Sequence, residues 1–198
     1  MATRDNNEEK ARKERMMWRV LDSEYIARRP WMTARRDRVQ LPNGTVHPEY
    51  YVLEYPDWVN VIAITRDGRF VMVEQYRHGL RGVFTELCAG VIEEGETPLE
   101  AAKRELQEET GYVGGTWELL AEICANPSCN NNITHCFLAR DVVPAGERHL
   151  DATEDINVRL LTEDELLEML CADEMKQALM LAPLWKYFAE KRRKNCSC

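Results

Sequence analysis

The chain has 198 residues, of which 44% are hydrophobic, so its length suits one domain with an N-terminal extension and its composition argues against wholesale disorder. It carries 34 acidic and 26 basic residues, a formal net charge of −8. This balance opposes nucleic acid as a partner, because nucleic-acid-binding proteins usually carry a basic surplus. It does not exclude a small anionic substrate, since metal ions and a few arginines can reverse the sign within one cleft.

Apolar segments and cysteines indicate the compartment. The N-terminus has no apolar run that could act as a signal peptide, and no stretch approaches the ~18 apolar residues of a membrane span. The seven cysteines are an odd number, and Cys124, Cys129 and Cys136 have neither the paired spacing nor the histidines of a zinc site. We therefore expect reduced thiols in a cytoplasmic protein, with no membrane partner.

The N-terminal part of the chain is predicted to contain mainly strands. Residues 1–16 are a charge-mixed run, which indicates a frayed helix or a disordered tail. Residues 18–26 alternate well enough to form a strand. Two further segments flank Pro42, Asn43 and Gly44, a turn signal that predicts a β-hairpin. We expect residues 1–56 to form an N-terminal antiparallel β extension.

Residues 57–198 are expected to form the main domain. Residues 58–65 and 69–76 flank Asp67 and Gly68, a second hairpin signal, and the first segment is rich in β-branched side chains. A helix is predicted from residue 98 to about Thr110, with Thr97 as N-cap and Gly111 as stop. Further strands are predicted at residues 117–125, 133–143 and 156–161, followed by amphipathic helices at 161–173 and 174–194. This order predicts an α+β fold, a mixed α/β/α sandwich.

The predicted helix carries a cluster of carboxylates. Glu105, Glu108 and Glu109 are spaced i, i+3 and i+4, so their side chains emerge on one face. Like charges at this spacing repel one another, which costs stability unless a cation offsets it. Carboxylate oxygens suit hard cations, magnesium above all. The alternative is an ordinary solvated acidic face, because acidic helix surfaces are common.

The wider pattern resembles the Nudix box. The residues at the positions of that signature are Gly90, Glu96, Arg104, Glu105, Leu106, Glu108, Glu109, Gly111 and Tyr112. Only Tyr112 departs from the signature, which usually ends in an aliphatic residue. The resemblance implies a Nudix-like fold and an enzyme that hydrolyses nucleoside diphosphates linked to another moiety.

The resemblance also implies roles for single residues. Glu105, Glu108 and Glu109 would bind metal and act in catalysis, with the main-chain carbonyl of Ala89 as a further ligand. Glu96 and Arg104 would form an ion pair that holds the loop to the helix, and Gly90 and Gly111 would support the site structurally. The implied cofactor is Mg²⁺, with Mn²⁺ as an alternative.

Two features are similar to the ADP-ribose pyrophosphatase branch of this family. Residues 73–77 (VEQYR) and 86–90 (ELCAG) resemble segments of that branch, with Cys88 where proline is usual. Pro127, fifteen residues beyond Tyr112, stands where that branch carries a marker proline. Arg77 resembles an arginine that contacts the diphosphate or the far ribose, and Arg81 is a second candidate; the alternative for Arg77 is a strand-end arginine in water.

Three more expectations follow from the resemblance. Glu154, with Asp155 as second choice, would be the catalytic carboxylate of a late loop; the alternative is an ordinary acidic loop. The aromatic residues Trp18, Trp31 and Tyr51 are available to stack on adenine, or to fill a core or dimer interface. The N-terminal hairpin resembles the small extra sheet that supports dimerisation in these enzymes, which implies a homodimer.

Three alternative functions stay open at this point. The substrate of a Nudix enzyme could instead be a GDP-sugar, NADH, a dinucleoside polyphosphate or an oxidised nucleotide. A non-catalytic Nudix domain could sense a nucleotide, although such a domain would be expected to have lost a metal-binding glutamate. A structural protein could carry the acidic helix as a solvated face.

Overall fold

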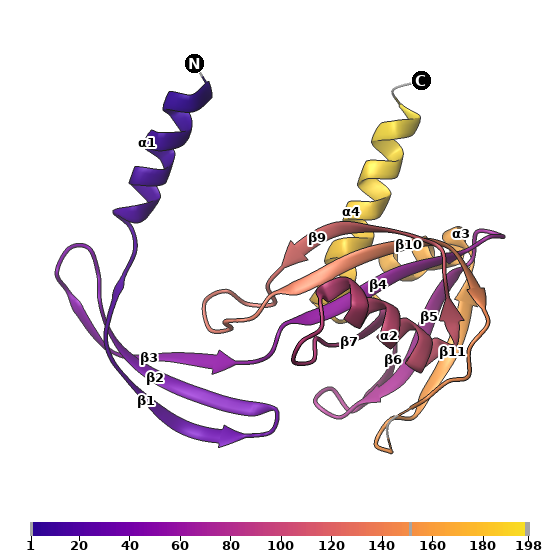
Figure 1. Ribbon diagram of the computed structural model, residues 1–198, viewed down its shortest axis with the longest axis horizontal. Helices are drawn as coiled ribbons and strands as arrows, with labels where there is room; N and C mark the ends of the chain where they lie inside the picture. The colour runs from indigo at the N-terminus through magenta and orange to yellow at the C-terminus, as the bar shows by residue number, and fades with distance from the viewer. Residues whose placement is uncertain (1, 151, 197–198) are drawn as a thin grey trace. The chain divides into compact units, whose positions relative to one another are not determined.

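The computed structural model describes residues 2–150 and 152–196, which divide into two compact units. The first unit contains the chain up to Tyr55 together with Asn126–Asn131, and the second contains Pro56–Ala125 and the chain from Asn132 onward. Figure 1 shows the helices and strands of both units, most of them labelled. Among the described residues, no helix combines the length and the apolar character needed to cross a membrane.

The first unit consists of a helix and a three-stranded antiparallel sheet. Its elements in chain order are α1 (Ala2–Glu14), β1 (Arg19–Arg29), β2 (Met32–Gln40) and β3 (Val46–Glu54). The sheet order is β1-β2-β3 and both pairings are antiparallel, so the predicted strand and hairpin are confirmed. The hairpin turn needs Gly44, because the backbone there has φ 85, a left-handed conformation that favours glycine.

Ion pairs are frequent in this sheet, and buried apolar side chains are few. Arg38 of β2 pairs with Asp22 of β1 at 2.6 Å and Arg36 of β2 with Glu49 of β3 at 3.1 Å, while Asp37 accepts from Arg35 within β2 at 2.8 Å. Of the apolar side chains described in this unit, Val39 alone is buried. A sheet with so little apolar burial gains little free energy from the hydrophobic effect.

The segment Asn126–Asn131 packs against β3, although it follows the second unit's strands in sequence. Leu53 donates its N–H to the carbonyl of Cys129 at 2.7 Å, and Tyr55 donates its N–H to the side chain of Asn131 at 3.0 Å. The hydroxyl of Tyr50 donates to the carbonyl of Ser128. The first unit is therefore built from two stretches of chain that lie far apart in sequence.

The second unit contains one mixed sheet. Its strands are β4 (Trp58–Thr65), β5 (Phe70–Arg77), β6 (Gly82–Glu86), β7 (Cys88–Val91), β8 (Tyr112–Val113), β9 (Thr116–Ile123), β10 (Thr134–Pro144) and β11 (Ile156–Leu161). The central path is β11-β5-β4-β10-β8, with β6 on β5, β7 on β4 and β9 on β10. The β4–β10 pair is parallel and the other pairs are antiparallel. The sequence does not predict the strands β6, β7 and β8. None exceeds five residues, which is too short to show a recognisable alternation of apolar and polar side chains.

Helices cover both faces of this sheet, which confirms the predicted α/β/α sandwich. On one face, Ala101, Ala102 and Leu106 of α2 (Pro98–Thr110) join the core formed by Val61, Ala63 and other strand residues. The other face is covered by α3 (Glu163–Cys171) and α4 (Ala178–Asn195). Its core contains Ile62, Phe70, Met72, Leu138, Leu166, Leu170 and Leu184, among others. Alternate residues of β4 thus enter different cores, as strand geometry requires.

The helix α2 begins and ends as predicted. Thr97 accepts the N–H of Glu100 and the carboxylate of Glu100 accepts the N–H of Thr97, so both partners of a capping box are present. Gly111 takes φ 74 and donates its N–H to the carbonyl of Gln107 at 2.8 Å, which closes the C-terminus. These caps fix which turn of the helix faces β7.

Candidate active site

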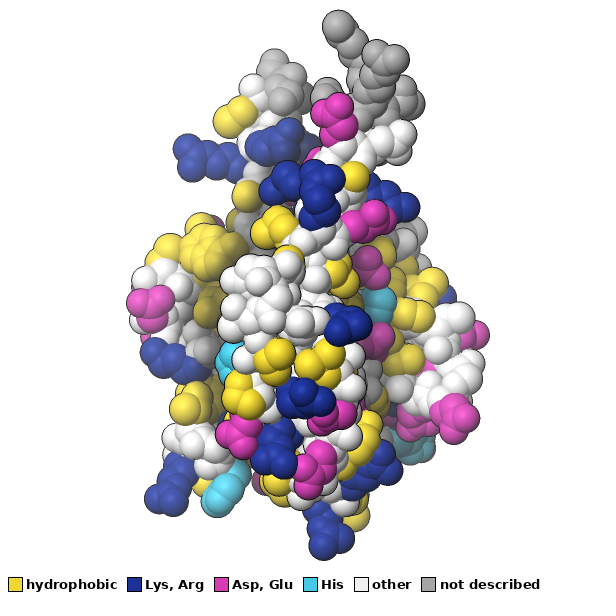
Figure 2. All heavy atoms as spheres, turned by 90° about the vertical axis from the view of Figure 1, so that its left-hand side faces the viewer, with side chains coloured by type: hydrophobic (Ala, Val, Ile, Leu, Met, Phe, Trp, Pro, Cys, Tyr) yellow, Lys and Arg dark blue, Asp and Glu magenta, His cyan; other side chains and the backbone are white. Residues whose placement is uncertain are grey.

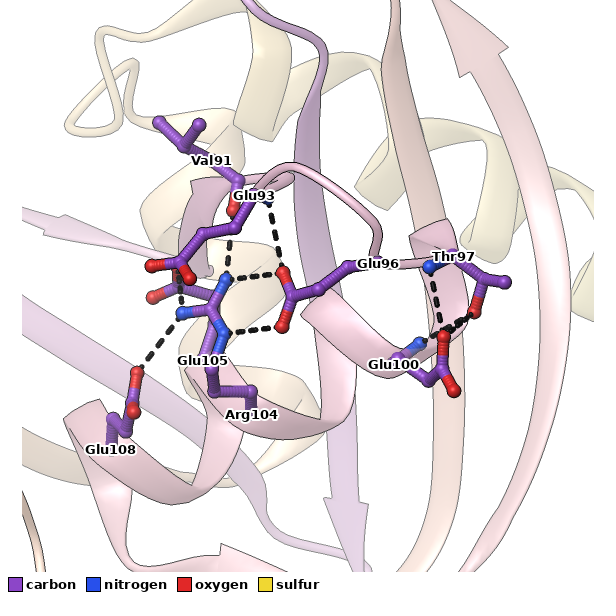
Figure 3. Close-up of polar contacts among 8 residues, drawn as sticks. All are labelled: Val91, Glu93, Glu96, Thr97, Glu100, Arg104, Glu105 and Glu108. Carbon is purple, nitrogen blue, oxygen red and sulfur yellow. Dashed lines mark hydrogen bonds and ion pairs between the residues drawn. The ribbon is translucent and has the colours of Figure 1, made fainter.

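Arg104 lies at the centre of an ion-pair network between α2 and the loop that precedes it (Figure 3). Its guanidinium donates to the two carboxylate oxygens of Glu96 at 2.7 and 2.8 Å and to the carbonyl of Val91 at 2.9 Å. The expected Glu96–Arg104 ion pair is therefore present. The hydrogen bonds from Arg104 lower the pKa of Glu96 to about 2 and themselves raise the pKa of Arg104.

The same guanidinium also holds two of the three clustered glutamates. Its Nη1 lies 2.7 Å from Glu105 Oε1 and 3.0 Å from Glu108 Oε2 (Figure 3). Burial raises the pKa of Glu105, Arg104 opposes this shift, and the charges of Glu108 and Glu154 add to it. A protein cation thus offsets charge that the helix face would otherwise leave unbalanced.

Glu109 is the most buried carboxyl group of the helix. Only 3% of the residue is exposed, and its Oε2 accepts the N–H of Ala89 at 3.2 Å. The thiol of Cys88 also donates to this carboxylate, a contact that sequence reasoning missed. Burial raises the pKa of Glu109 to about 8, and the charges of Glu105 and Glu154 raise it as well. An anionic Glu109 therefore needs a nearby cation.

Gly90 leaves room for one of these carboxylates. A Cβ at this position would lie 2.0 Å from Glu105 Cδ, so a larger residue and the present Glu105 cannot coexist. Gly90 belongs to β7, next to Ala89, whose N–H contacts Glu109. The strand and the helix therefore approach each other closely at the point where the carboxylates gather.

This donor set fits a hard divalent cation in its chemistry. It offers carboxylate oxygens from Glu105, Glu108 and Glu109, of which Glu109 contacts the backbone of β7, and burial penalises the charges of Glu105 and Glu109. Within the described parts of the chain, no three His, Cys, Asp or Glu side chains are close enough to hold an ion as they stand. Arg104 explains this, because Glu105 and Glu108 turn toward its guanidinium. Coordination of a metal would require these two side chains to rotate.

Glu154 and Asp155 lie in the exposed loop before β11. The charge of Glu154 raises the pKa of both Glu105 and Glu109, so its carboxylate lies within electrostatic range of the helix cluster. The assignment of Glu154 as the catalytic carboxylate, rather than as an ordinary acidic loop residue, stays a prediction.

The two arginines considered for substrate binding differ in their surroundings. Arg77, at the end of β5, donates to Glu86 at 2.6 Å, and Glu86 is only 3% exposed. A buried carboxylate therefore orients the Arg77 guanidinium. Arg81 lies in the exposed turn before β6 and has φ 53, a left-handed conformation.

The remaining candidates belong to the first unit. Trp31 is 69% exposed at the turn between β1 and β2, with φ 62, and Tyr51 is half exposed on β3. Trp18 packs edge-on against Tyr50, with ring centroids 5.7 Å apart. Pro127 is exposed in the segment that packs on β3. Hydrophobic side chains lie between charged ones on the face seen in Figure 2.

Arg148 is a further residue near the helix that sequence reasoning missed. Its Nε donates to the carbonyl of Glu109 at 2.7 Å, although 39 positions separate the two residues. The sequence does indicate that the C-terminus of α2 needs a basic partner from elsewhere in the chain, because the last turn of the helix has no basic residue of its own. The sequence could not show which of the many other basic residues would fill that place.

Comparisons with known proteins agree with this geometry. The model of the NUDIX domain matches residues 54–181, and that of the nucleoside diphosphate sugar hydrolase N-terminal domain matches residues 18–53. The ADP-ribose pyrophosphatase of Bacillus subtilis (strain 168) is 34% identical over 71% of this chain and 76% of its own length. The methanol dehydrogenase activator of Bacillus methanolicus is 38% identical over 67% of this chain and 71% of its own length.

A solved structure agrees in fold. A crystal structure of an ADP compounds hydrolase superposes with a TM-score of 0.78 over 89% of this chain and 95% of the other, at 21% sequence identity. The family model covers well over half of the chain and includes β7, α2 and the loop of Glu154. This chain therefore belongs to the Nudix family, as a pyrophosphohydrolase related to the ADP-ribose pyrophosphatases.

Proposed function

We propose that this protein hydrolyses ADP-ribose to AMP and ribose 5-phosphate with Mg²⁺ as cofactor. The observation that carries the proposal is the carboxylate cluster on α2, in which Glu105 and Glu108 share a guanidinium and Glu109 is buried beside β7. Buried anions that repel one another cost stability, so their retention suits a site that gathers cations. Nudix hydrolases generally use divalent metal ions, and relatives of this chain are ADP-ribose pyrophosphatases.

The proposed ligands are the carboxylates of Glu105, Glu108 and Glu109 and the main-chain carbonyl of Ala89. Mg²⁺ held by these oxygens would neutralise charge on the diphosphate and lower the pKa of water at the site, so that deprotonated water could attack phosphorus at neutral pH; Mn²⁺ is the alternative. Arg104 and Glu96 would keep the helix attached to its loop, and Gly90 leaves room for the carboxylate of Glu105.

Glu154 is the proposed general base. Its charge raises the pKa of Glu105 and Glu109, and this electrostatic influence on the cluster supports the proposal that Glu154 removes a proton from the attacking water. The oxygen of water forms a new bond to one phosphorus, and the bond from that phosphorus to the bridging oxygen breaks. Arg77, oriented by the buried Glu86, is proposed to neutralise the diphosphate, with Arg81 as a further contact.

The first unit, proposed as residues 1–56, would serve dimerisation. Its sheet exposes large apolar side chains, including Val20, Tyr25, Ile26 and Met32, and buries few. Apolar side chains exposed in this way are stabilised when a second copy of the chain covers them. Trp31 and Pro127 are proposed substrate contacts on this unit, with Trp31 stacking on adenine.

The proposed compartment is the cytoplasm. Cys88, Cys129, Cys136, Cys171 and Cys196 are free thiols in the structure. Reduced thiols persist in a compartment kept reducing by small-molecule thiols. A small nucleotide, rather than a nucleic acid, is the proposed partner, in line with the net charge of −8.

Product analysis in water enriched in heavy oxygen tests the substrate and the attacked atom together. ADP-ribose with Mg²⁺ should yield AMP and ribose 5-phosphate, with the label in one of the two products. A panel of GDP-sugar, NADH and dinucleoside polyphosphate should be cleaved more slowly. Cleavage of a panel member but not of ADP-ribose would make the substrate wrong, and binding without any cleavage would favour a nucleotide sensor.

A further inference from the structure

The C-terminal turn of α2 carries charge of the unfavourable sign. The carboxylates of Glu108 and Glu109 lie near the negative end of the helix dipole, and this turn contains no basic residue. The last carbonyls of a helix also need partners, because no further turn supplies their hydrogen bonds. Partners for this end must therefore come from another part of the chain.

The segment after β10 supplies these partners. The N–H groups of Ala145 and Gly146 both donate to the carbonyl of Gly111 at 3.2 Å, and His149 donates to the carbonyl of Glu108 at 3.0 Å. A Cβ on Gly111 would lie 3.0 Å from the Gly146 carbonyl oxygen and 3.4 Å from Arg148 Cγ. The segment therefore lies directly against the end of the helix that bears the acidic cluster.

Arg148 connects this helix end to β11. Its Nε donates to the carbonyl of Glu109 at 2.7 Å, and its Nη2 donates to the carbonyl of Ile156 at 2.5 Å. Ile156 is the first residue of β11, and it directly follows the loop that contains Glu154. One guanidinium thus bridges the backbone of a carboxylate residue on α2 and the base of the loop.

The loop is consequently fixed at both ends. His149 attaches its start to Glu108, and Arg148 attaches its end to Glu109 through Ile156. Glu154 lies between these two attachments. A planar group with several donors suits this task, since it can contact two carbonyls at once in a fixed geometry.

We propose that Arg148 is a positioning residue that sets the distance between Glu154 and the carboxylates of α2. The proposal rests on the proposed function, in which Glu154 removes a proton from the attacking water. Arg148 acts through the loop and does not touch the substrate. Loss of the bridge allows Glu154 to move away from the cluster, while substrate contacts such as Arg77 stay in place.

Kinetics of ADP-ribose hydrolysis at saturating Mg²⁺ test this role. Arg148→Ala should lower kcat about 10- to 100-fold, as is usual for residues that orient a reacting group, with KM changed less than about 2-fold. Arg148→Lys restores a cation at the helix end but cannot bridge two carbonyls as a fork does. Arg148→Ala should also lower the Tm. The lysine variant should recover most of this loss of Tm but little of the loss of kcat. Recovery of kcat by lysine would overturn the bridging role.

A double-mutant cycle separates positioning from a general structural effect. In a Glu154→Gln background, adding Arg148→Ala should cost less than about 3-fold, because residues that act as a unit are not additive. The full loss in that background would overturn the proposal. Arg159→Ala is the matched control, since Arg159 lies on β11 and bridges side chains of β5 and β6 instead. It should leave kcat within about 2-fold of wild type.

Hydrogen exchange tests the attachment without any substrate. Arg148→Ala should speed amide exchange at residues 149–150 and 152–156 and in the last turn of α2, and should leave the rest of the sheet unchanged. Unchanged exchange at residues 149–150 and 152–156 would overturn the proposal. If wild-type protein bound ADP-ribose but did not cleave it, the proposed function would fail, and this measurement would still decide whether Arg148 holds the loop.

Discussion

The helices α2 and α3 begin in the same way but differ in where their acidic residues cluster. Thr97 with Glu100 and Thr162 with Glu165 form complete capping boxes. In α3 the acidic side chains occupy the first turn, where the helix dipole favours negative charge. In α2 the clustered glutamates come in the last two turns, where the dipole disfavours it.

The two helices also differ in how far their acidic side chains are buried, and this changes the pKa of those side chains. The capping interactions with Thr162 lower the pKa of Glu165, whereas burial raises that of Glu109 to about 8. The capping Glu165 of α3 thus stabilises its helix, whereas the buried Glu109 of α2 opposes folding unless a cation neutralises it. The position of a charge relative to the helix dipole and the core, rather than the number of charges, distinguishes a candidate metal site from a solvated surface.

Glu108→Gln should give the largest effect. The substitution removes one proposed ligand, so kcat for ADP-ribose should fall about 1,000-fold while the fold stays intact or slightly more stable. Glu168→Gln, at an exposed position of α3, is the matched control and should leave turnover unchanged. Turnover and thermal melting measure the two outcomes. Equal losses in both variants, or unfolding of Glu108→Gln, would remove the functional distinction between the two helices.

The second test extends the comparison to the loop before β11. Glu154→Gln should lower kcat about 100-fold, as expected for loss of a general base, whereas Asp155→Asn should change it less than about 3-fold. The two variants alter neighbouring acidic residues of one loop, so each controls for the other. A larger loss of kcat with Asp155→Asn would identify Asp155, rather than Glu154, as the general base.

The third test concerns the space beside Glu105. Mg²⁺ at about 100 times its Kd should stabilise the wild type by about 2.7 kcal/mol, which is about 5–10 °C in Tm for a chain of this size. Gly90→Ala should lose this shift, because the new Cβ occupies the place of the Glu105 carboxylate. Gly79→Ala is the control, since no atom lies within 4 Å of its Cβ. An undiminished shift in Gly90→Ala would show that ion binding does not need the Glu105 carboxylate in its place beside Gly90.

The smallest effect concerns stability and pH without metal. The pKa of Glu109 is about 8 in the folded protein, above its unfolded value of 4.5. Between these values the folded protein binds more protons, so its free energy of unfolding falls as the pH rises. Metal-free Glu109→Gln should therefore melt a few °C above wild type at pH 8 and near wild type at pH 4.5. For a chain of this size, a gain of 1 kcal/mol in the free energy of unfolding raises the Tm by about 2–4 °C. The same advantage at both pH values would show that burial of charge is not the cause.

Local signals made the helix predictable and the sheet only partly so. Thr97, Glu100 and Gly111 mark both ends of α2 within the sequence of the helix itself, and its bounds were correct. The strands β6 and β7 are separated by Leu87 alone, so no sequence period could reveal them. The pairing of β3 with Asn126–Asn131 joins distant positions and depends on the path of the whole chain.

The site was predictable where its residues share a helix or a motif. The spacing of Glu105, Glu108 and Glu109 and the pairing of Glu96 with Arg104 followed from the sequence. The contacts of Cys88 and Arg148 with Glu109 did not, because each joins side chain and helix across a tertiary interface. The turn of Glu105 and Glu108 toward Arg104 was also missed, since it depends on how the guanidinium lies between them.

The five contacts of Arg104 have a consequence for chelation. One guanidinium touches both oxygens of Glu96, one oxygen each of Glu105 and Glu108, and the carbonyl of Val91. Protein stripped of divalent ions therefore retains a counterion for part of its acidic cluster. We expect inactivation by a chelator to be reversible on simple re-addition of the ion, with no refolding lag, so that supply of the ion can act as an on–off control of a standing pool of enzyme.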